Sequence, residues 1–562
     1  RLYSRPRRKE QQDVRCLQRT LLKPVARLAA MQVSGQVRRW LASHQRTAEV
    51  QQQVLRELLA RHADSDFGRE HGLDRIRTYE EFTRAVPVRS YEQLRPWVRR
   101  VFHGEPRALL GPGEKVLMFS QTSGSTGEPK NIPVTQGFLA DMRRGWNIFG
   151  YQALMQHRDA WLRPILQISS PMQETTSPTG LPCGAISGLL AETQKRIVRR
   201  MYPVPRDVFS VADAESKYYT ILRCGIGQDV AFITTANPSS TLRLIEIGRQ
   251  HIHQLIRDVA DGTCTPPAEL PEEVSRRLRF RPNFPLARRI EKGLRRDGQF
   301  RPEHVWRPTF LANWTGGTLQ LYVERLREWF PGVPVRDIGL LASEGRFSIP
   351  LADDTPGGVA EILGNFLEFI PTEHADDDAP PTLRAHELEV GGEYVLVFSN
   401  ATGLWRYNLG DRVRVTGHFH DSPVFEFLCR GAHTSSITGE KITEHQVVQA
   451  MRQATAELDS GVERFELQGR FAEPPYYELR IESRSDLSAD ALASALDRAL
   501  ARQNIEYASK RNSGRLGPVS PALLPSGEFA RREAQHIAKR RGRGEQYKHQ
   551  YLLTEVLRPV AR

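Results

Sequence analysis

The chain has 562 residues, too many for one ordinary domain, since domains average roughly 150 residues. Hydrophobic residues make up 39% and charged residues 26%, which supports sizeable hydrophobic cores and excludes a globally disordered protein. Lys and Arg number 79 against 66 Asp and Glu, a formal net charge of +13. This balance excludes an acidic protein and leaves nucleic acid, anionic membranes and nucleotides as candidate partners.

The cysteine pattern favours a reducing compartment. No two cysteines have CxxC spacing and none has a histidine cluster beside it, so neither a disulfide scaffold nor a cysteine zinc site is expected. The five cysteines are Cys16, Cys183, Cys224, Cys264 and Cys429. No apolar run approaches the roughly 20 residues of a membrane helix. The basic first residues are followed by no apolar segment, so no secretory signal is predicted. We expect a cytoplasmic protein without a membrane partner.

In chain order, the first elements predicted are helices. Residues 33–68 repeat apolar side chains at helical spacing, and residues 78–102 alternate short helical pieces with prolines. Residues 115–146 are predicted to form a strand, a loop of small residues and a helix. Apolar strands alternate with helices again in three later segments, 161–170, 229–250 and 333–346. This alternation is typical of an α/β fold with a buried, mainly parallel sheet.

The pattern changes near residue 390, where short strands separated by turns indicate a barrel-like antiparallel piece. Residues 433–445 are polar and are predicted to form a hinge. Beyond them, the order helix, strand, strand, helix predicts a small α+β domain. We therefore expect a large α/β domain over residues 1–432 and a small, mobile C-terminal domain over residues 446–562.

The most informative segment is the loop from Thr122 to Lys130, with the sequence TSGSTGEPK. Its glycines let backbone N–H groups approach an anion, its Ser and Thr add donors, and Lys130 adds a positive charge. Such a loop suits the β- and γ-phosphates of a nucleotide. It differs from a Walker A loop because Glu128 and Pro129 separate the second glycine from the lysine. The alternative is an ordinary flexible loop.

This loop resembles the phosphate-binding loop of the adenylate-forming enzymes, and residues 67–105 and 527–553 resemble the GH3 family of acyl acid amido synthetases. The resemblance implies an ATP- and Mg²⁺-dependent ligase that converts a small carboxylic acid to an acyl-adenylate and pyrophosphate. An amine, expected to be an amino acid, then takes the acyl group in an amide bond.

Two other interpretations stay open at this point. An acyl-CoA ligase uses the same fold and the same kind of loop. A basic nucleic-acid-binding protein with a vestigial fold is the alternative outside enzymes, although no zinc knuckle, RNP motif or interleaved aromatic residue supports it. The acid, the amine and the oligomeric state are not indicated by the sequence.

The resemblance also implies which residues form the site. Residues expected to bind ATP are Ser123, Gly124, Ser125, Thr126, Gly127, Lys130, Ser343, Asp411 and Arg430. Glu344 is expected to bind Mg²⁺, and Lys548 to stabilise the charge that develops at the α-phosphate. Taken alone, Glu344 and Asp411 are also typical turn residues, and Lys548 is one basic residue among many.

Weaker candidates follow from the same resemblance. Lys441, in the hinge, is a candidate for the second half-reaction. Trp314, Thr315, Gly316 and Leu340 are candidates for the acyl-substrate pocket, although a glycine turn at 314–317 is an equal alternative. Leu340 stands where the family has an aromatic residue that stacks on adenine.

Overall fold

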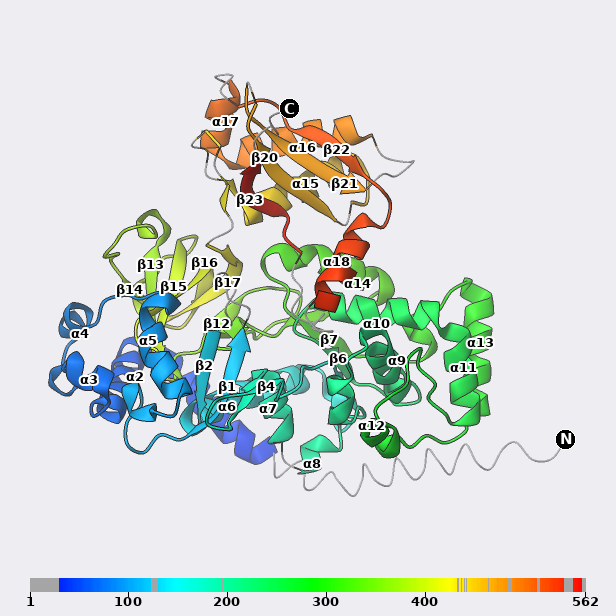
Figure 1. Cartoon of the computed structure of the whole chain (residues 1–562), viewed down its shortest axis with the longest axis horizontal. Coiled ribbons are helices and arrows are strands. Elements are labelled where there is room, and N and C mark those ends of the chain that lie inside the picture. The colour runs from blue at the N-terminus through cyan, green and yellow to red at the C-terminus, as the bar shows by residue number, and fades with distance from the viewer. Residues whose placement is uncertain are drawn as a thin grey trace.

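The computed structural model describes residues 30–122, 130–194, 196–431, 434–435, 437–438, 440, 442–462, 464–472, 474–482, 488–512, 516–539 and 549–557. Figure 1 shows a large body, which contains the chain as far as β17, and a smaller body that carries the C-terminal sheet. Within the described residues, no helix is long and apolar enough to cross a membrane.

Helices form the first part of the large body (Figure 1). They are a helix over residues 30–43, α2 (Thr47–His62), α3 (Asp66–Glu70), α4 (Tyr79–Ala85) and α5 (Tyr91–Phe102). Hydroxyl side chains cap three of them: Ser65 begins α3, and Thr78 and Ser90 form capping boxes before α4 and α5. The apolar faces of α2 to α5 share one core with the antiparallel sheet, so these helices fix that sheet's position.

The predicted phosphate loop joins two antiparallel strands. β1 (Val116–Thr122) pairs with β2 (Lys130–Thr135), and Thr122 opposite Lys130 is the last pair before the loop. α6 (Gln136–Gln156) follows at once, with the Thr135 hydroxyl accepting from the Phe138 amide. The expected order of strand, loop and helix is therefore wrong at this point. Residues 130–135 contribute buried Ile132 and Val134 to the sheet and form an extra strand.

Two further sheets complete the α/β part of the large body. β1 also pairs in parallel with β5 (Pro182–Gly184), which pairs antiparallel with β4 (Thr175–Thr176). A separate parallel sheet has the order β3 (Ile165–Gln167), β6 (Phe232–Thr234), β7 (Phe310–Asn313) and β8 (Val335–Asp337). The expected α/β class is confirmed, with this sheet as its parallel component.

Helices surround the parallel sheet on the right of Figure 1 and share its core. They are α9 (Ala214–Gly225), α10 (Pro238–Gln250), α11 (Ile252–Asp261), α12 (Glu272–Arg277), α13 (Phe284–Asp297) and α14 (Gln320–Trp329). Two helices precede them in the chain, α7 (Ile186–Glu192) and α8 (Arg196–Arg199), and α7 packs in another cluster with α6. Asn237 and Asn283 cap α10 and α13, and each helix has a proline in its first turn.

The antiparallel part begins earlier than residue 390. Its order is β11 (Ser348–Ile349), β12 (Gly358–Ala360), β17 (Ser422–Arg430), β16 (Tyr407–Phe419), β15 (Glu393–Asn400), β13 (Asn365–Pro371) and β14 (Leu383–Arg384). A small hairpin, β9 (Leu341–Ala342) and β10 (Gly345–Arg346), lies between β8 and this sheet in the chain. The alternating burial along β16 shows a sheet with one face toward the core.

The C-terminal body has its own hydrophobic core. Its elements are β18 (Thr434–Ser435), β19 (Ile442–Thr443), α15 (Glu444–Glu457), β20 (Phe465–Arg470), β21 (Tyr476–Glu482), α16 (Ala489–Gln503), α17 (Ile505–Asn512), β22 (Ser520–Leu524), α18 (Glu528–Lys539) and β23 (Leu552–Leu557). The main sheet has the order β22-β21-β20-β23. Arg452 on α15 reaches Glu324 on α14 at 2.6 Å, so the two bodies are in contact.

Candidate functional site

Lys130, at the C-terminal end of the predicted phosphate loop, is held by two tyrosines. Its ammonium donates to the Tyr407 hydroxyl at 3.0 Å and lies 5.3 Å from the centre of the Tyr91 ring. The Tyr91 hydroxyl in turn accepts from the Asn131 amide at 2.8 Å. Ring faces attract a cation without neutralising its formal charge. The two tyrosines therefore hold the lysine at the C-terminal end of the loop.

Ser343 and Glu344 form the two-residue turn between β9 and β10, and Glu344 is only 3% exposed. The Asn400 side chain donates to the Glu344 carbonyl at 2.8 Å and fixes the turn against β15. Burial, together with the negative charge of Glu344, raises the pKa of Tyr91 to about 12. The Glu344 carboxylate therefore acts on the same tyrosine that Lys130 contacts, which brings the hairpin turn and the loop end into one site.

Asp411 and Arg430 occupy facing positions on β16 and β17. Asp411 is 5% exposed, and the Gly431 amide donates to the Gly410 carbonyl at 2.6 Å just beyond the pair. Gly410 has φ of +77°, a conformation that glycine adopts without strain. Pairing of these two consecutive strands thus brings together two of the predicted nucleotide-binding residues.

The predicted substrate-pocket residues surround the turn after β8. The Trp314 indole donates to the Gly339 carbonyl at 3.0 Å, and the Thr315 amide and hydroxyl donate to Asp337 at 2.6 and 2.7 Å. The Leu340 amide donates to the Ser348 hydroxyl at 2.9 Å. Gly316 lies apart from this turn, where an added Cβ would come within 3.0 Å of the Phe427 carbonyl on β17.

Asp337 holds this arrangement together and was not predicted from the sequence. Its carboxylate accepts from the Thr315 amide and hydroxyl and from the Gly339 amide. Burial nevertheless raises its pKa to about 6. An aspartate at the end of a buried parallel strand was a signal for this role, because the carboxyl ends of such strands carry binding residues.

Arg406 has a structural role, although it lies in the motif that ends at Asp411. Its guanidinium makes a buried ion pair with Glu368 at 2.8 Å and donates to the Val86 carbonyl at 2.9 Å. These bonds connect β16 with β13 and with the end of α4. The next residue, Tyr407, is the one that contacts Lys130.

Several predicted site residues lie outside the described residues. They are Ser123, Gly124, Ser125, Thr126, Gly127, Lys441 and Lys548. Arg430 is described only through its backbone, as part of β17. Their roles stay predictions.

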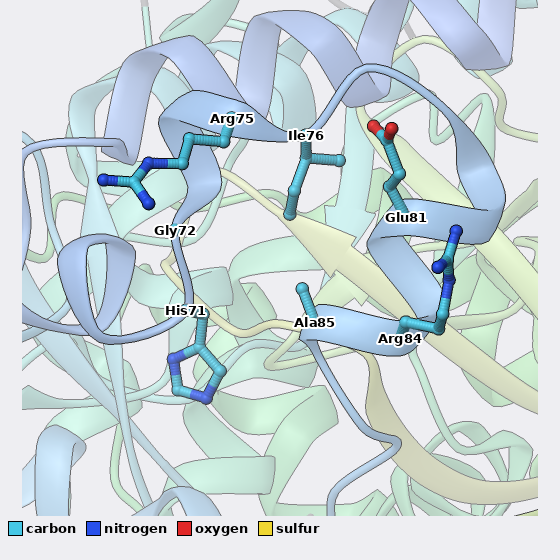
Figure 2. A pocket seen from close by; sticks show the side chains of 7 residues that line it. All are labelled: His71, Gly72, Arg75, Ile76, Glu81, Arg84 and Ala85. Carbon is cyan, nitrogen blue, oxygen red and sulfur yellow. The ribbon is translucent and has the colours of Figure 1, made fainter.

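A surface pocket in the N-terminal helices lies away from these residues. Figure 2 shows His71, Arg75 and Arg84 around it, between the turn after α3 and helix α4. None of the predicted site residues lines it.

One group of potential metal ligands among the described residues, Asp297, Glu303 and His304, also lies elsewhere, at the end of α13. His304 and Arg296 both bind the Asp297 carboxylate, so its charge is already compensated.

The fold is that of an α/β enzyme in which Lys130 and the buried Glu344 both lie near Tyr91. The chain belongs to the GH3 family: the models of the family's N-terminal, central and C-terminal domains match residues 37–335, 361–430 and 445–556. The family predicted from the sequence is confirmed.

Named relatives and solved structures agree with this family. The chain is 25% identical to indole-3-acetic acid-amido synthetase GH3.3 of Arabidopsis thaliana, over 85% of each chain. It is 22% identical to jasmonoyl-L-amino acid synthetase JAR4 of Nicotiana attenuata, over 86% of this chain and 87% of that one. The structure of the GH3.15 acyl acid amido synthetase superposes with a TM-score of 0.77 at 20% identity, over 91% of this chain and 92% of that one. These names agree with the enzyme class predicted from the sequence.

Proposed function

We propose that this protein is an ATP-dependent acyl acid amido synthetase that joins a small carboxylic acid to an amine, with an amino acid as the expected amine. The observation that carries the proposal is the match of the three GH3 domain models to residues 37–335, 361–430 and 445–556, with which the position of Lys130 between Tyr91 and Tyr407 agrees. Membership of the GH3 family supports it.

The charges at this site suit ATP and one divalent cation. Lys130 supplies the positive charge for the phosphates, together with the donors of residues 123–127. Glu344 with Ser343 fits Mg²⁺, which takes one or two protein carboxylates and completes its shell with phosphate oxygens and water. When bound, Mg²⁺ neutralises charge on the phosphates. Asp411 accepts hydrogen bonds from the ribose hydroxyls in this proposal, and Arg430, at the facing position of the adjacent strand, contacts the nucleotide.

The first step forms a bond between a carboxylate oxygen of the acid and the α-phosphorus of ATP. The bond from that phosphorus to the bridging oxygen breaks, and pyrophosphate leaves with the electron pair. In the second step the neutral amine attacks the acyl carbon, AMP leaves, and the amine loses one proton. Electrostatic stabilisation of the transferring phosphate is the main contribution expected of the protein.

The small C-terminal domain has a separate role in the proposal. Residues 446–562 rotate about residues 433–445 and bring Lys548 to the α-phosphate for the first step, and Lys441 serves the second. A residue that is brought to the site by domain rotation is suited to stabilise charge that develops only in the transition state.

The test is a product analysis with purified protein, ATP, Mg²⁺ and a panel of carboxylic acids, supplied with mixed amino acids or with CoA. Amide and AMP detected by mass spectrometry, without thioester, are the expected result. Thioester without amide would instead identify an acyl-CoA ligase. Failure to release pyrophosphate with any acid, together with tight DNA binding, would favour a nucleic-acid-binding protein.

A further inference from the structure

Arg346, on β10 two residues after Glu344, has a buried guanidinium that makes no hydrogen bond to any described residue. It is 3% exposed, and its Nε, Nη1 and Nη2 atoms lack partners in the described part of the chain. Burial lowers its pKa to about 10, against the charges of Glu361 and Asp337, so it remains charged at neutral pH. A buried guanidinium with unmade hydrogen bonds is costly, which makes it a strong indication of a missing partner.

The surroundings of Arg346 are built to hold it. The guanidinium lies over the Trp146 ring, 4.4 Å from the ring centre, and 5.8 Å from the Phe149 ring. Gly145 makes room for the side chain, because an added Cβ would overlap Arg346 Cδ. The buried Trp146 Nε1 also lacks a partner among the described residues. Both unpaired groups are donors, so the partner that would satisfy them is an oxygen acceptor.

Arg346 packs against the same group of side chains as the predicted acyl-substrate residue Trp314. Trp146, Phe149 and Trp314 belong to one hydrophobic cluster. Asp337, whose charge acts on Arg346, is the residue that accepts from Thr315.

We propose that Arg346, assisted by the Trp146 N–H, binds an oxygen atom of the acyl acid at the end remote from the reacting carboxylate. This inference rests on the proposed function and names its substrate class. The substrates are acids with a carboxylate, carbonyl or hydroxyl oxygen at their far end.

The remote end is indicated by the chemistry of the two steps. The reacting carboxylate loses its negative charge once it is bonded to the α-phosphorus, whereas Arg346 stays buried and charged. An oxygen at the far end accepts from the guanidinium throughout both steps. An acid ending in a methyl group would leave the donors unpaired, and sites built to bind a substrate oxygen reject such analogues strongly.

The experiment measures pyrophosphate release with matched acids: hexanoate, 6-hydroxyhexanoate and adipate, and benzoate, 4-hydroxybenzoate and terephthalate. We expect the wild type to prefer the oxygen-terminated member of at least one series by about 10-fold or more in kcat/KM. Arg346→Met should abolish that preference, mainly by raising KM for the oxygen-terminated acid, because it removes the hydrogen bonds that the charged guanidinium donates. Comparison of the hydroxyl-terminated with the carboxylate-terminated acid shows whether Arg346 prefers a neutral or an anionic oxygen acceptor.

Two glycines of α6 provide a matched pair of variants. Gly145→Ala displaces Arg346 and should raise KM for the oxygen-terminated acid. Gly150→Ala, on the same helix, places its Cβ where no atom lies within 4 Å and should leave KM unchanged. Arg346→Met should melt at or above the wild-type temperature, since it removes a buried charge whose hydrogen bonds are unmade.

Three results would overturn the inference. One is pyrophosphate release by the wild type without preference for an oxygen-terminated acid. Another is a fall in kcat/KM of Arg346→Met that is equally large for the methyl- or hydrogen-terminated acid and for its oxygen-terminated counterpart. A third is a lower melting temperature of Arg346→Met together with an unchanged preference for the oxygen-terminated acid. No pyrophosphate release with any acid would instead refute the proposed function itself.

Discussion

Replacing Arg406 by Met should strongly destabilise the large body, because it leaves a carboxylate buried without its cation. The side chains of Arg406 and Glu368 are 4% and 0% exposed, and Nη2 lies 2.8 Å from Oε1. The Arg406 Nε atom also donates to Oε2 at 3.0 Å, which makes the pair bidentate. Breaking a buried ion pair by removing one partner typically costs about 3–5 kcal/mol.

Other contacts set where in that range the cost should fall. Glu368 keeps the Tyr79 hydroxyl at 2.9 Å and the Thr382 hydroxyl at 3.0 Å, which favours the lower end, about 3 kcal/mol. The double variant Arg406→Met/Glu368→Met removes both charges. The Val86 carbonyl then lacks its donor, and the Tyr79 and Thr382 hydroxyls lose the carboxylate but keep their bond to each other at 2.7 Å. The double variant should cost only about 1–2 kcal/mol, less than the single variant.

Equilibrium unfolding in urea, followed by tryptophan fluorescence, measures these differences, and buried Trp405 lies beside the pair in the chain. Arg414→Met is the matched control. This variant breaks the ion pair between Arg414 and Glu393, which has the same 2.8 Å length. The Arg414 side chain is 36% exposed and the Glu393 side chain 39% exposed. Such a pair contributes about 0–1 kcal/mol. The reasoning would be refuted if Arg406→Met cost no more than this control, or if the double variant were less stable than the single one.

Three further predictions concern the proposed chemistry. Lys130→Met should weaken ATP binding about 10- to 100-fold by calorimetry, whereas Tyr407→Phe, which removes only the hydroxyl that Lys130 contacts, should change it less than about 3-fold. Glu344→Gln should slow pyrophosphate release about 10²- to 10³-fold and raise the Mg²⁺ concentration required; an unchanged Mg²⁺ titration would contradict its role. Lys548→Ala should slow adenylate formation by about 10²–10³ and leave ATP binding intact, and a wild-type rate would make it a surface residue.

The sequence predicted those parts of the fold that depend on local patterns. Helical spacing in residues 33–68 predicted the helix over 30–43, α2 and α3. The order helix, strand, strand, helix predicted α15, β20, β21 and α16. The sequence did not predict β2, because residues 130–135 have only three apolar side chains and one of these is a proline. Pairing with β1 makes that segment a strand, and such pairing is a tertiary effect.

Motifs in the sequence supply candidate site residues whose roles stay predictions, whereas contacts between distant residues could not be predicted. Glu344 and Lys130 follow from their motifs. The partner of Arg406 is Glu368, and the aromatic side chains around Arg346 come from α6, about 200 residues earlier in the chain. No local pattern records such contacts. Arg406 also shows that a residue within a predicted nucleotide-binding motif can stabilise the fold through a buried ion pair.

Asp337 leads to a prediction about pH, in which two effects oppose each other. Burial disfavours the ionised carboxyl, whereas the donors on Thr315 and Gly339 favour it. Burial is the larger effect, and the pKa of Asp337 is raised from 3.8 to about 6. A group with a raised pKa in the folded state contributes stability that is present below the unfolded pKa and is lost as the pH rises through the folded pKa.

The side chain of the Asp337→Asn variant cannot ionise, so the variant does not lose this stability as the pH rises. Its free energy of unfolding should be lower than that of the wild type at pH 4.5, because one of its amide groups faces a backbone donor. The deficit should shrink by about 2 kcal/mol between pH 4.5 and pH 7, since each pKa unit is worth about 1.4 kcal/mol. Urea unfolding at both pH values measures the difference, and Asp261→Asn, at an exposed position, is the control. A deficit that stays constant, or one that grows toward pH 7, would mean that the three hydrogen bonds outweigh burial and keep Asp337 ionised throughout.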